Sequence, residues 1–282
     1  MITIEQHEWI NAHAYVPEHC VGLMTRVSGG EPFLTEDYLC CLTGDVLIVV
    51  GYPLGREFDS NALEMALNRI VERFRPKRLS LAAPEVPKSL TNSCVEREID
   101  QYYTLDLSSL TILPGLRRTI AKAARNLRIE HGNALSEAHE ELAREFVGLV
   151  NPPPRVKALL FKMWDYVGAT EDSIVLSAWD RDEKLAAFYV VDFSTTLFST
   201  YVIGCHSKKN YVSGASDLLT SEMIRLSVQR GKKYIHLGLG VNPGIRRFKE
   251  KWGGVPSMKY ETCEIAVRKP SLLDAIVGFT VR

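Results

Sequence analysis

Two strand–helix–strand patterns, one in each half of the chain, constrain the fold more than any other feature. In the first, residues 45–51 and 78–83 are short apolar runs rich in β-branched side chains. Residues 60–74 lie between them and carry apolar side chains at helical spacing, and Asp59 is a suitable N-cap. The pattern predicts two buried strands joined by an amphipathic helix, which is typical of α/β proteins.

The second pattern repeats this order later in the chain. Residues 199–204 and 234–240 are the two apolar runs, and a helix lies between them. Ser216 or Asp217 can cap that helix, and Gly231 ends it. We interpret the repeat as an internal duplication, against the alternative of chance similarity between two common α/β segments.

The remaining residues predict further elements around the second pattern. No low-complexity linker divides the chain, and we expect a boundary near residues 105–112 that separates domains 1–111 and 112–282. The fold class is α/β with a mixed sheet. The expected elements are a strand over 99–107, helices over 115–128, 136–150 and 155–167, strands over 173–179, 184–193 and 196–204, a short helix after residue 240, and a last strand over 259–268.

Composition excludes several classes of function. Apolar residues make up 46% of the chain, which is enough for a sizeable core and excludes a disordered protein. Lys and Arg together number 34, as do Asp and Glu, so no bulk charge attracts nucleic acid or an anionic membrane. The sequence lacks a signal peptide and any apolar stretch of about 20 residues, so we expect a cytoplasmic protein. The six cysteines lack C-x-x-C spacing, which favours free thiols and no metal.

The stretch from Tyr234 to Gly254 carries a family resemblance. An apolar strand that ends in glycine is followed by a short helix with a Phe-Lys pair and then by Trp-Gly. Together with the basic helix over residues 116–125, this stretch resembles tandem members of the GCN5-related N-acetyltransferase (GNAT) superfamily. The similar families are the Fem-type peptidoglycan aminoacyltransferases and the transferase domain of lysylphosphatidylglycerol synthases. The resemblance implies a tandem GNAT-like fold, with a degenerate unit over 1–111 and a more complete unit over 112–282.

The resemblance also implies a site for an acyl-CoA donor, with acetyl-CoA the expected one. In the GNAT fold two neighbouring strands part to receive the thioester arm, and the pyrophosphate lies at the N-terminus of the next helix. The loop here keeps a single glycine of the usual R/Q-x-x-G-x-G/A, so the alternative is a capping loop that binds nothing. The expected donor-binding residues are Lys208, Lys209, Ser213, Gly214, Ala215, Ser216, Asn242, Arg246 and Lys249.

Acyl transfer to an amine needs a base for the amine proton and donors for the oxyanion. The candidates are His206, which follows the strand glycine, Tyr211 in the loop, and His236. His236 has apolar neighbours, so its alternative is a hydrogen-bonded core histidine. Phe248 and Lys249 stand where many GNAT enzymes have the tyrosine that protonates the thiolate, so that role is not assigned.

The expected activity is transfer of an acyl group from acyl-CoA, or from an aminoacyl donor, to an amine. The zero net charge and the absence of a coiled-coil arm disfavour tRNA as a partner. The expected acceptor is a small-molecule amine or a cell-envelope precursor. The competing hypothesis is a GNAT-like binding or regulatory module without turnover, because the loop has one glycine and the tyrosine is missing.

Overall fold

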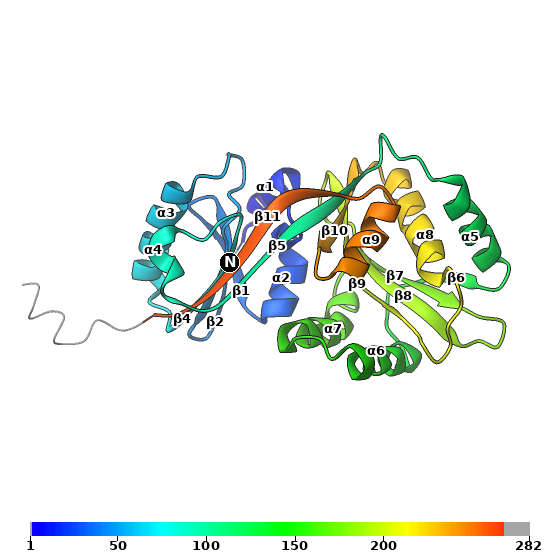
Figure 1. Cartoon of the computed structure of the whole chain (residues 1–282). Coiled ribbons are helices and arrows are strands. Elements are labelled where there is room, and N and C mark those ends of the chain that lie inside the picture. The colour runs from blue at the N-terminus through cyan, green and yellow to red at the C-terminus, as the bar shows by residue number, and fades with distance from the viewer. Residues whose placement is uncertain (1, 268–282) are drawn as a thin grey trace, which may run out of the picture. The chain divides into compact units, whose positions relative to one another are not determined.

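The computed structural model describes residues 2–267, which form two compact units (Figure 1). The first unit contains residues 2–3, 28–100 and 259–267, and the second contains residues 4–27 and 101–258. This division differs from the single cut expected near residue 111. The reason is that two long strands, β5 (Cys94–Asp106) and β11 (Val255–Ala266), each contribute residues to both units.

The first unit contains the first predicted pattern. Its parallel strands β3 (Val46–Val50) and β4 (Arg78–Ala83) are joined by α3 (Ser60–Phe74), as the sequence predicts. Asp59 caps α3, because its Oδ1 accepts the Ala62 N–H at 2.7 Å. The sheet order is β1-β2-β3-β4-β11. The remaining elements are β1 (Glu31–Thr35), β2 (Tyr38–Thr43) and α4 (Lys88–Thr91).

A disulfide joins Cys94 to Cys263 in the first unit, so the expectation of free thiols is wrong for this pair. The two residues are 169 positions apart, and only the pairing of β11 with β4 brings Cys263 into this unit. The spacing of cysteines along the chain therefore gave no indication of the bond. The other four cysteines are free and buried.

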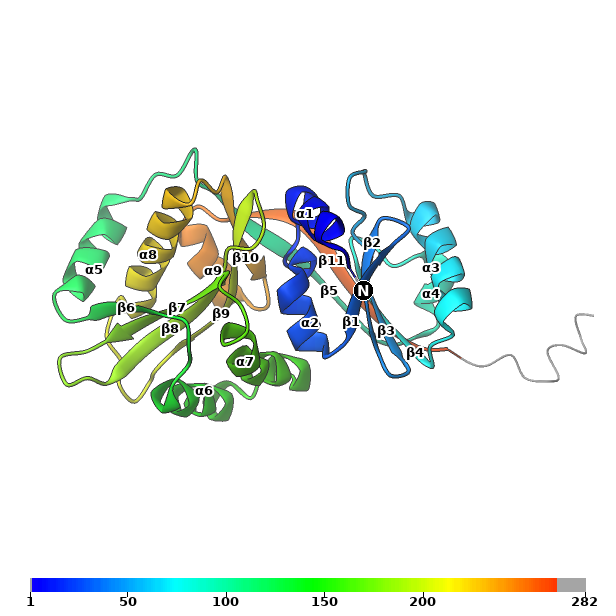
Figure 2. The same ribbon diagram turned by 180° about the vertical axis from the view of Figure 1, so that it is seen from behind.

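The second unit has the sheet order β5-β10-β9-β8-β7-β6, with helices on both faces (Figures 1 and 2). Residues of α5 and α8 share one hydrophobic core, and residues of α2, α6 and α7 share another. The bounds of the elements are α1 (Ile4–His13), η1 (Pro17–His19), α2 (Val21–Ser28), α5 (Pro114–Ala124), β6 (Arg128–Gly132), α6 (Glu137–Val150), α7 (Pro154–Val167), β7 (Ser173–Trp179), β8 (Leu185–Asp192), β9 (Phe198–His206), α8 (Ala215–Gln229), β10 (Tyr234–Leu239) and α9 (Pro243–Lys251).

The two units share one topology, which confirms the tandem arrangement. In the first, an antiparallel pair (β2/β3), a parallel pair (β3/β4) and an antiparallel pair (β4/β11) follow one another across the sheet. In the second, β8/β9, β9/β10 and β10/β5 repeat the same three directions. The crossover helices α3 and α8 both have 15 residues. Each unit is thus completed by a strand from a distant part of the chain.

Two predicted boundaries in the second unit are wrong. The basic helix α5 ends at Ala124, and residues from Arg128 onward form the edge strand β6. Leu127 continues the apolar spacing of the helix, but its side chain enters the core from the turn that follows. Helix α8 begins at Ala215, so its N-cap residue is Gly214, which has a φ of +83°, and not Ser216 or Asp217.

No helix among residues 2–267 combines the length and the apolar character needed to cross a bilayer.

Candidate active site

The parallel strands β9 and β10 part in the second unit. Their register consists of three pairs, of which the last joins Thr200 to His236. Beyond it, β9 runs on to His206 while paired only with β8. In the first unit the corresponding strands β3 and β4 keep five pairs, and the Gly51 N–H still donates to the Ala82 carbonyl at 2.7 Å. The stretch beyond Thr200 and His236, where β9 and β10 no longer pair, is called the gap below, and it is a feature of the second unit.

Both strands that border the gap are irregular beside it. The register of β9 with β8 shifts at Val202, and the register of β10 with β5 shifts between His236 and Leu239. Gly238 lies in the second irregularity and has a φ of +74°, which favours glycine. Bulges of this kind bend a strand and redirect its backbone groups. Here they lie beside the point where β9 and β10 stop pairing, and the Gly238 N–H and the Leu239 carbonyl of β10 bond to the side chains of His236 and Lys249.

Lys249 of α9 brings a buried ammonium group to the gap. Its side chain is 5% exposed, and Nζ donates to the Leu239 carbonyl at 2.5 Å. Nζ also lies 5.6 Å from the centre of the Tyr103 ring. A Cβ atom added to Gly238 would lie 4.0 Å from both Lys249 Nζ and the Tyr201 carbonyl oxygen of β9. The positive charge is thus held between the two parting strands.

His236 is fully buried beside this lysine. Its Nδ1 accepts the Gly238 N–H at 3.2 Å, and its ring packs edge-on against Tyr102 at 4.7 Å. Among the described residues its Nε2 has no hydrogen-bond partner. Burial, and then the charge of Lys249, lower the pKa of His236 to about 3. The imidazole is therefore neutral near pH 7, and it is too weak a base to be a good proton acceptor there.

His206 and Tyr211 lie farther along the chain, at the end of β9 and in the following loop. Burial, and then the charge of Lys208, lower the pKa of His206 below its usual value. Tyr211 is 62% exposed, and Lys208 Nζ lies 5.8 Å from the centre of its ring. A neutral His206 near the surface can accept a proton, which distinguishes it from the buried His236.

The loop after β9 is anchored by Glu145 of α6, which the sequence analysis did not single out. Its carboxylate accepts the backbone N–H of Lys208 at 2.6 Å and of Lys209 at 3.0 Å, and the Ser207 hydroxyl at 2.9 Å. Burial raises the pKa of Glu145, but the hydrogen bonds outweigh burial and leave the pKa below its usual value. Glu145 lies more than 60 residues before the loop, so no local pattern indicated this contact.

The start of α8 is packed against α5. A Cβ atom at Gly214 would lie 3.0 Å from Thr119 Cγ2 and 3.2 Å from Ala123 Cβ. The glycine is therefore explained by helix packing as well as by its φ. Arg118 and Lys122, which directly precede these two residues in α5, are exposed and basic.

Asp217 adds a buried carboxylate to the first turn of α8. It accepts hydrogen bonds from Lys251 Nζ at 2.5 Å and from the Trp252 indole N–H at 3.1 Å. The ammonium of Lys251 balances the charge of Asp217, so the carboxylate opposes an incoming anion less than an unpaired one would. The contact also ties α9 to α8.

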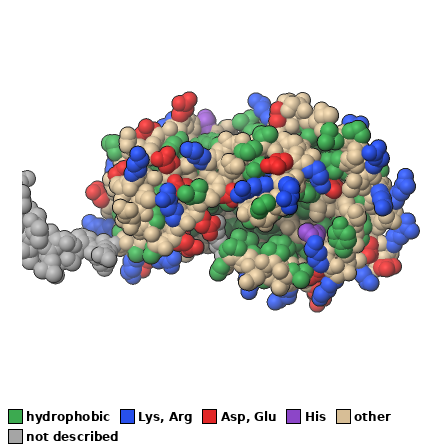
Figure 3. Space-filling model, viewed as in Figure 1, with side chains coloured by type: hydrophobic (Ala, Val, Ile, Leu, Met, Phe, Trp, Pro, Cys, Tyr) green, Lys and Arg blue, Asp and Glu red, His purple; other side chains and the backbone are tan. Residues whose placement is uncertain are grey.

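Asn242 and Arg246, which the sequence assigns to the donor, lie in α9. Asn242 caps that helix, because its Oδ1 accepts the Ile245 N–H at 3.0 Å. Arg246 is exposed, and Figure 3 shows Lys and Arg side chains gathered over this helix. Ser213 and Ala215 flank Gly214 at the start of α8, beside Ser216. The structure thus places most of the expected donor residues around two helix starts, and buries Lys249 between the strands.

Metal ligands do not gather near this site. In the described part of the chain, no group of three or more His, Cys, Asp or Glu side chains is placed to hold a metal ion.

Comparisons with known proteins place this fold. No protein-family model matches the sequence, and no curated protein matches it significantly. The structure is similar to the C-terminal DUF2156 domain of a putative lysylphosphatidylglycerol synthetase from Agrobacterium fabrum, with 16% identity, a TM-score of 0.58 and 91% of each chain covered. It is similar to FemX, with 10% identity, a TM-score of 0.62, and 93% of this chain and 96% of FemX covered.

A GCN5-related N-acetyltransferase from Kribbella flavida is also similar, with 14% identity, a TM-score of 0.53, and 90% of this chain and 95% of that chain covered. These likenesses show a GNAT-like fold of the type found in Fem proteins and lysylphosphatidylglycerol synthetases. Within that class of fold, the chain is built as two tandem units.

Proposed function

We propose that the second unit transfers an acyl group from acyl-CoA to an amine acceptor. The observation that supports this most is the parting of β9 and β10 after Thr200 and His236, with the Lys249 ammonium held beside the gap. Strand β9 loses its β10 partner there, so its backbone can hydrogen-bond an extended donor arm as a neighbouring strand would. The closed strands of the first unit offer no such edge.

The start of α8 suits the phosphates of the donor. The Ala215 N–H donates to the Val212 carbonyl at 3.2 Å, so the helix dipole and the first-turn amides from Ser216 onward are what favour an anion there. Glu145 holds the preceding loop in place, so the donor does not have to order it. Cationic side chains can add positive charge around this phosphate-binding position. They are Lys208 and Lys209 of the loop, Arg118 and Lys122 of α5, and Arg246 of α9.

Three residues suit the chemistry of acyl transfer: Lys249 at the gap, and His206 and Tyr211 farther along the chain. The amine nitrogen attacks the thioester carbonyl carbon, the C–S bond breaks, and the amine loses a proton. We assign stabilisation of the developing oxyanion to the ammonium of Lys249. This group lies in a buried site, where charge interactions are strong. We assign removal of the amine proton to His206, whose imidazole is kept neutral by its lowered pKa. Tyr211 is the candidate acid for the thiolate, and His236 is a positioning residue that holds the Gly238 N–H.

The choice of donor and acceptor rests on charge and on the similar folds. A net charge of zero disfavours tRNA, whose phosphates call for a wide basic surface. Acyl-CoA, with acetyl-CoA as the first to test, is therefore the proposed donor in a cytoplasmic reaction. The likeness to FemX and to a lysylphosphatidylglycerol synthetase domain supports a small amine or a cell-envelope precursor as the acceptor.

A thermal-shift titration with acetyl-CoA and longer acyl-CoA thioesters tests the proposal. A donor at 100 times its dissociation constant adds about 2.7 kcal/mol to the free energy of unfolding. Release of free CoA that depends on an added amine then shows transfer. Absence of any shift, with no CoA release, overturns the proposal. A thermal shift without CoA release for any of a broad panel of amines, together with no transfer from aminoacyl-tRNA as a second donor, favours the non-catalytic binding module.

A further inference from the structure

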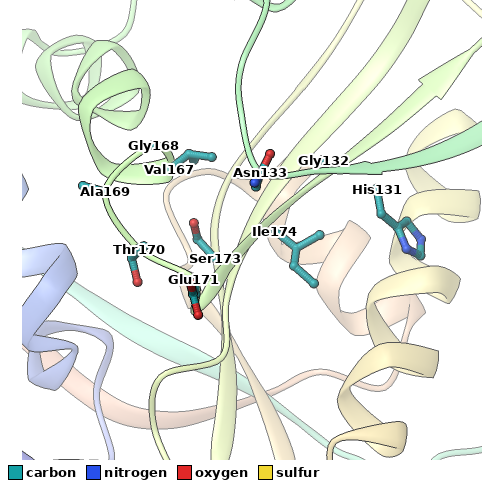
Figure 4. Close-up of a pocket in the computed structure, with 10 residues that line it drawn as sticks. All are labelled: His131, Gly132, Asn133, Val167, Gly168, Ala169, Thr170, Glu171, Ser173 and Ile174. Atoms are coloured by element: carbon teal, nitrogen blue, oxygen red, sulfur yellow. The ribbon is translucent and has the colours of Figure 1, made fainter.

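A small cavity of about 240 Å³ lies between α1, α2 and α7 in the second unit. Its lining is polar and carries both signs of charge. The loop from Gly168 to Asp172 separates it from a larger cavity of about 760 Å³ (Figure 4), and Ala169 and Thr170 line both. The residues that matter for its chemistry are His7, Arg26, Tyr166, Asp172, Asp192 and Ser194.

Asp192 supplies a buried carboxylate to this cavity. The residue is 1% exposed. Its Oδ1 accepts the Ser194 N–H at 3.0 Å and the Ser194 hydroxyl at 2.6 Å, and its Oδ2 accepts the Tyr166 hydroxyl. Within residues 2–267 it forms no ion pair, and the ammonium of Lys232, bonded to the Phe193 and Thr195 carbonyls, interacts with it only at longer range. An ionised carboxylate can accept about four hydrogen bonds. The Tyr166 hydroxyl and the two donors of Ser194 account for three of them. A cationic ligand would complete the set.

A positive charge lies on another part of the same lining. Arg26 of α2 is exposed and lines the cavity, and His7 of α1 lines it as well. A buried carboxylate and a guanidinium that line one space fit a ligand with an ammonium group and a carboxylate. The cavity has room for roughly eight water molecules, since a water occupies about 30 Å³ in the liquid, which suits a compact zwitterion.

The cavity lies close to the gap of the candidate active site. Asp192 is the register partner of Thr200, the last residue of β9 that pairs with β10. Neighbouring strands lie about 4.8 Å apart, so the carboxylate belongs to the strand next to the parting point. Its register partner on β7, Ser173, is 2% exposed, lines the larger cavity, and has an Oγ without a partner among the described residues.

We propose that this cavity binds a free α-amino acid, with the α-ammonium group on Asp192 and the α-carboxylate on Arg26. The binding does not depend on the acyl-CoA reaction, and it is tested without a donor. The site discriminates the zwitterion from molecules that carry only one of the two charges. Asp172 and His7 lie at the lining and add a second acidic and a second basic group.

The test is isothermal titration calorimetry of the full chain with each proteinogenic amino acid. The best ligand is then compared with its decarboxylated amine and its deaminated acid. We expect the amino acid to bind at least about tenfold more tightly than either analogue, because each loses one charge-assisted contact. No binding of any amino acid at millimolar concentration, or equal binding of the amine and the amino acid, overturns the proposal.

Two variants locate the binding. Asp192→Asn should abolish binding of the amino acid and of the amine. Arg26→Gln changes an exposed residue, so the fold is retained, and it should weaken the amino acid about tenfold while leaving the amine unchanged. Lys157→Gln, at an exposed position of α7 that does not line the cavity, is the matched control. Unchanged affinity in Arg26→Gln would contradict the assignment even if Asp192→Asn fails to fold. Acyl-CoA binding measured on the same samples separates failure of this site from failure of the proposed function.

Discussion

Thr200 of β9 and His236 of β10 are the last register partners before the two strands separate. Thr200 is 2% exposed, and His236 is fully buried. Just beyond them, the ammonium of Lys249 is fixed on the Leu239 carbonyl. The separation therefore begins at a packed, charged point and not at a frayed strand end.

Replacing Lys249 tests the assignment of the oxyanion. Lys249→Met keeps the length of the side chain and removes its charge. Loss of one oxyanion donor lowers kcat by about 100-fold or more, and we expect that loss with acyl-CoA bound nearly as well as by the unchanged protein. Arg247→Met, at an exposed position of the same helix, is the control and should retain activity. A Lys249→Met protein that is folded and fully active would disprove the role.

The pH dependence of the reaction tests His206. A base acts in its neutral form, so kcat/KM should rise with pH through a pKa below 6.5, and should be level above it. His206→Gln should lower activity and remove this rise. Lys208→Gln removes a positive charge that lowers the pKa, so it should move the rise to higher pH. If kcat/KM rises at the same pH in both variants as in the unchanged protein, another group causes the rise.

Glu145 should control the order of the loop after β9. Glu145→Ala removes the acceptor of two backbone N–H groups, so the amides of Lys208 and Lys209 should exchange with solvent much faster. The folded pKa of Glu145 is depressed, so its stabilising effect is present above the unfolded value of about 4.3 and is lost as pH falls through the folded pKa. Glu141→Ala, at an exposed position of the same helix, should leave these amides protected. Hydrogen exchange followed by mass spectrometry measures both variants.

Two buried histidines should make the chain less stable in mild acid. Burial, and for His236 the charge of Lys249, lower the pKa to about 3 for His236 and to about 4 for His139. The unfolded chain gains protons near pH 6.5, so each histidine costs about 2 kcal/mol between pH 7 and pH 5. Urea unfolding at the two pH values measures this loss. His236→Leu should reduce the difference, and an unchanged difference would exclude His236 as its source.

The disulfide should stabilise the first unit. Reduction of the bond between Cys94 and Cys263, or the double variant Cys94→Ser/Cys263→Ser, should lower the free energy of unfolding by about 2–5 kcal/mol, because the bond closes a very long loop. Denaturant unfolding with and without reductant measures it. The double variant should be insensitive to reductant, and any remaining sensitivity would point to another cysteine.

Local patterns in the sequence predicted the elements that depend on local physics. The α3 helix with its Asp59 cap, the strands β3 and β4 on either side of it, the helices α6 and α7, and the strands β7 and β8 were predicted from periodicity and turn residues. The sequence misplaces the start of α8, because two good capping residues follow Gly214 although the helix already begins at Ala215. Strand β6 was missed, because its alternation is short and begins directly after a helix.

The site depends on contacts that no local pattern contains. The Phe248–Lys249 pair was recognised through a family resemblance, but burial of Lys249 follows from how α9 packs. The anchoring of Lys208 by Glu145 joins residues from different helices and loops. The lowered pKa of His236 needs the position of Lys249, which sequence spacing alone does not give.

The late position of β11 in the chain has a consequence for synthesis. Residues 261–266 pair with β4, whose residues were made 178 to 188 positions earlier. Until they leave the ribosome, β4 has an open edge with unsatisfied backbone groups, where foreign strands can add. A nascent chain stalled before residue 259 should therefore bind chaperones or aggregate, and resistance to protease in the first unit should appear only when the last strand emerges.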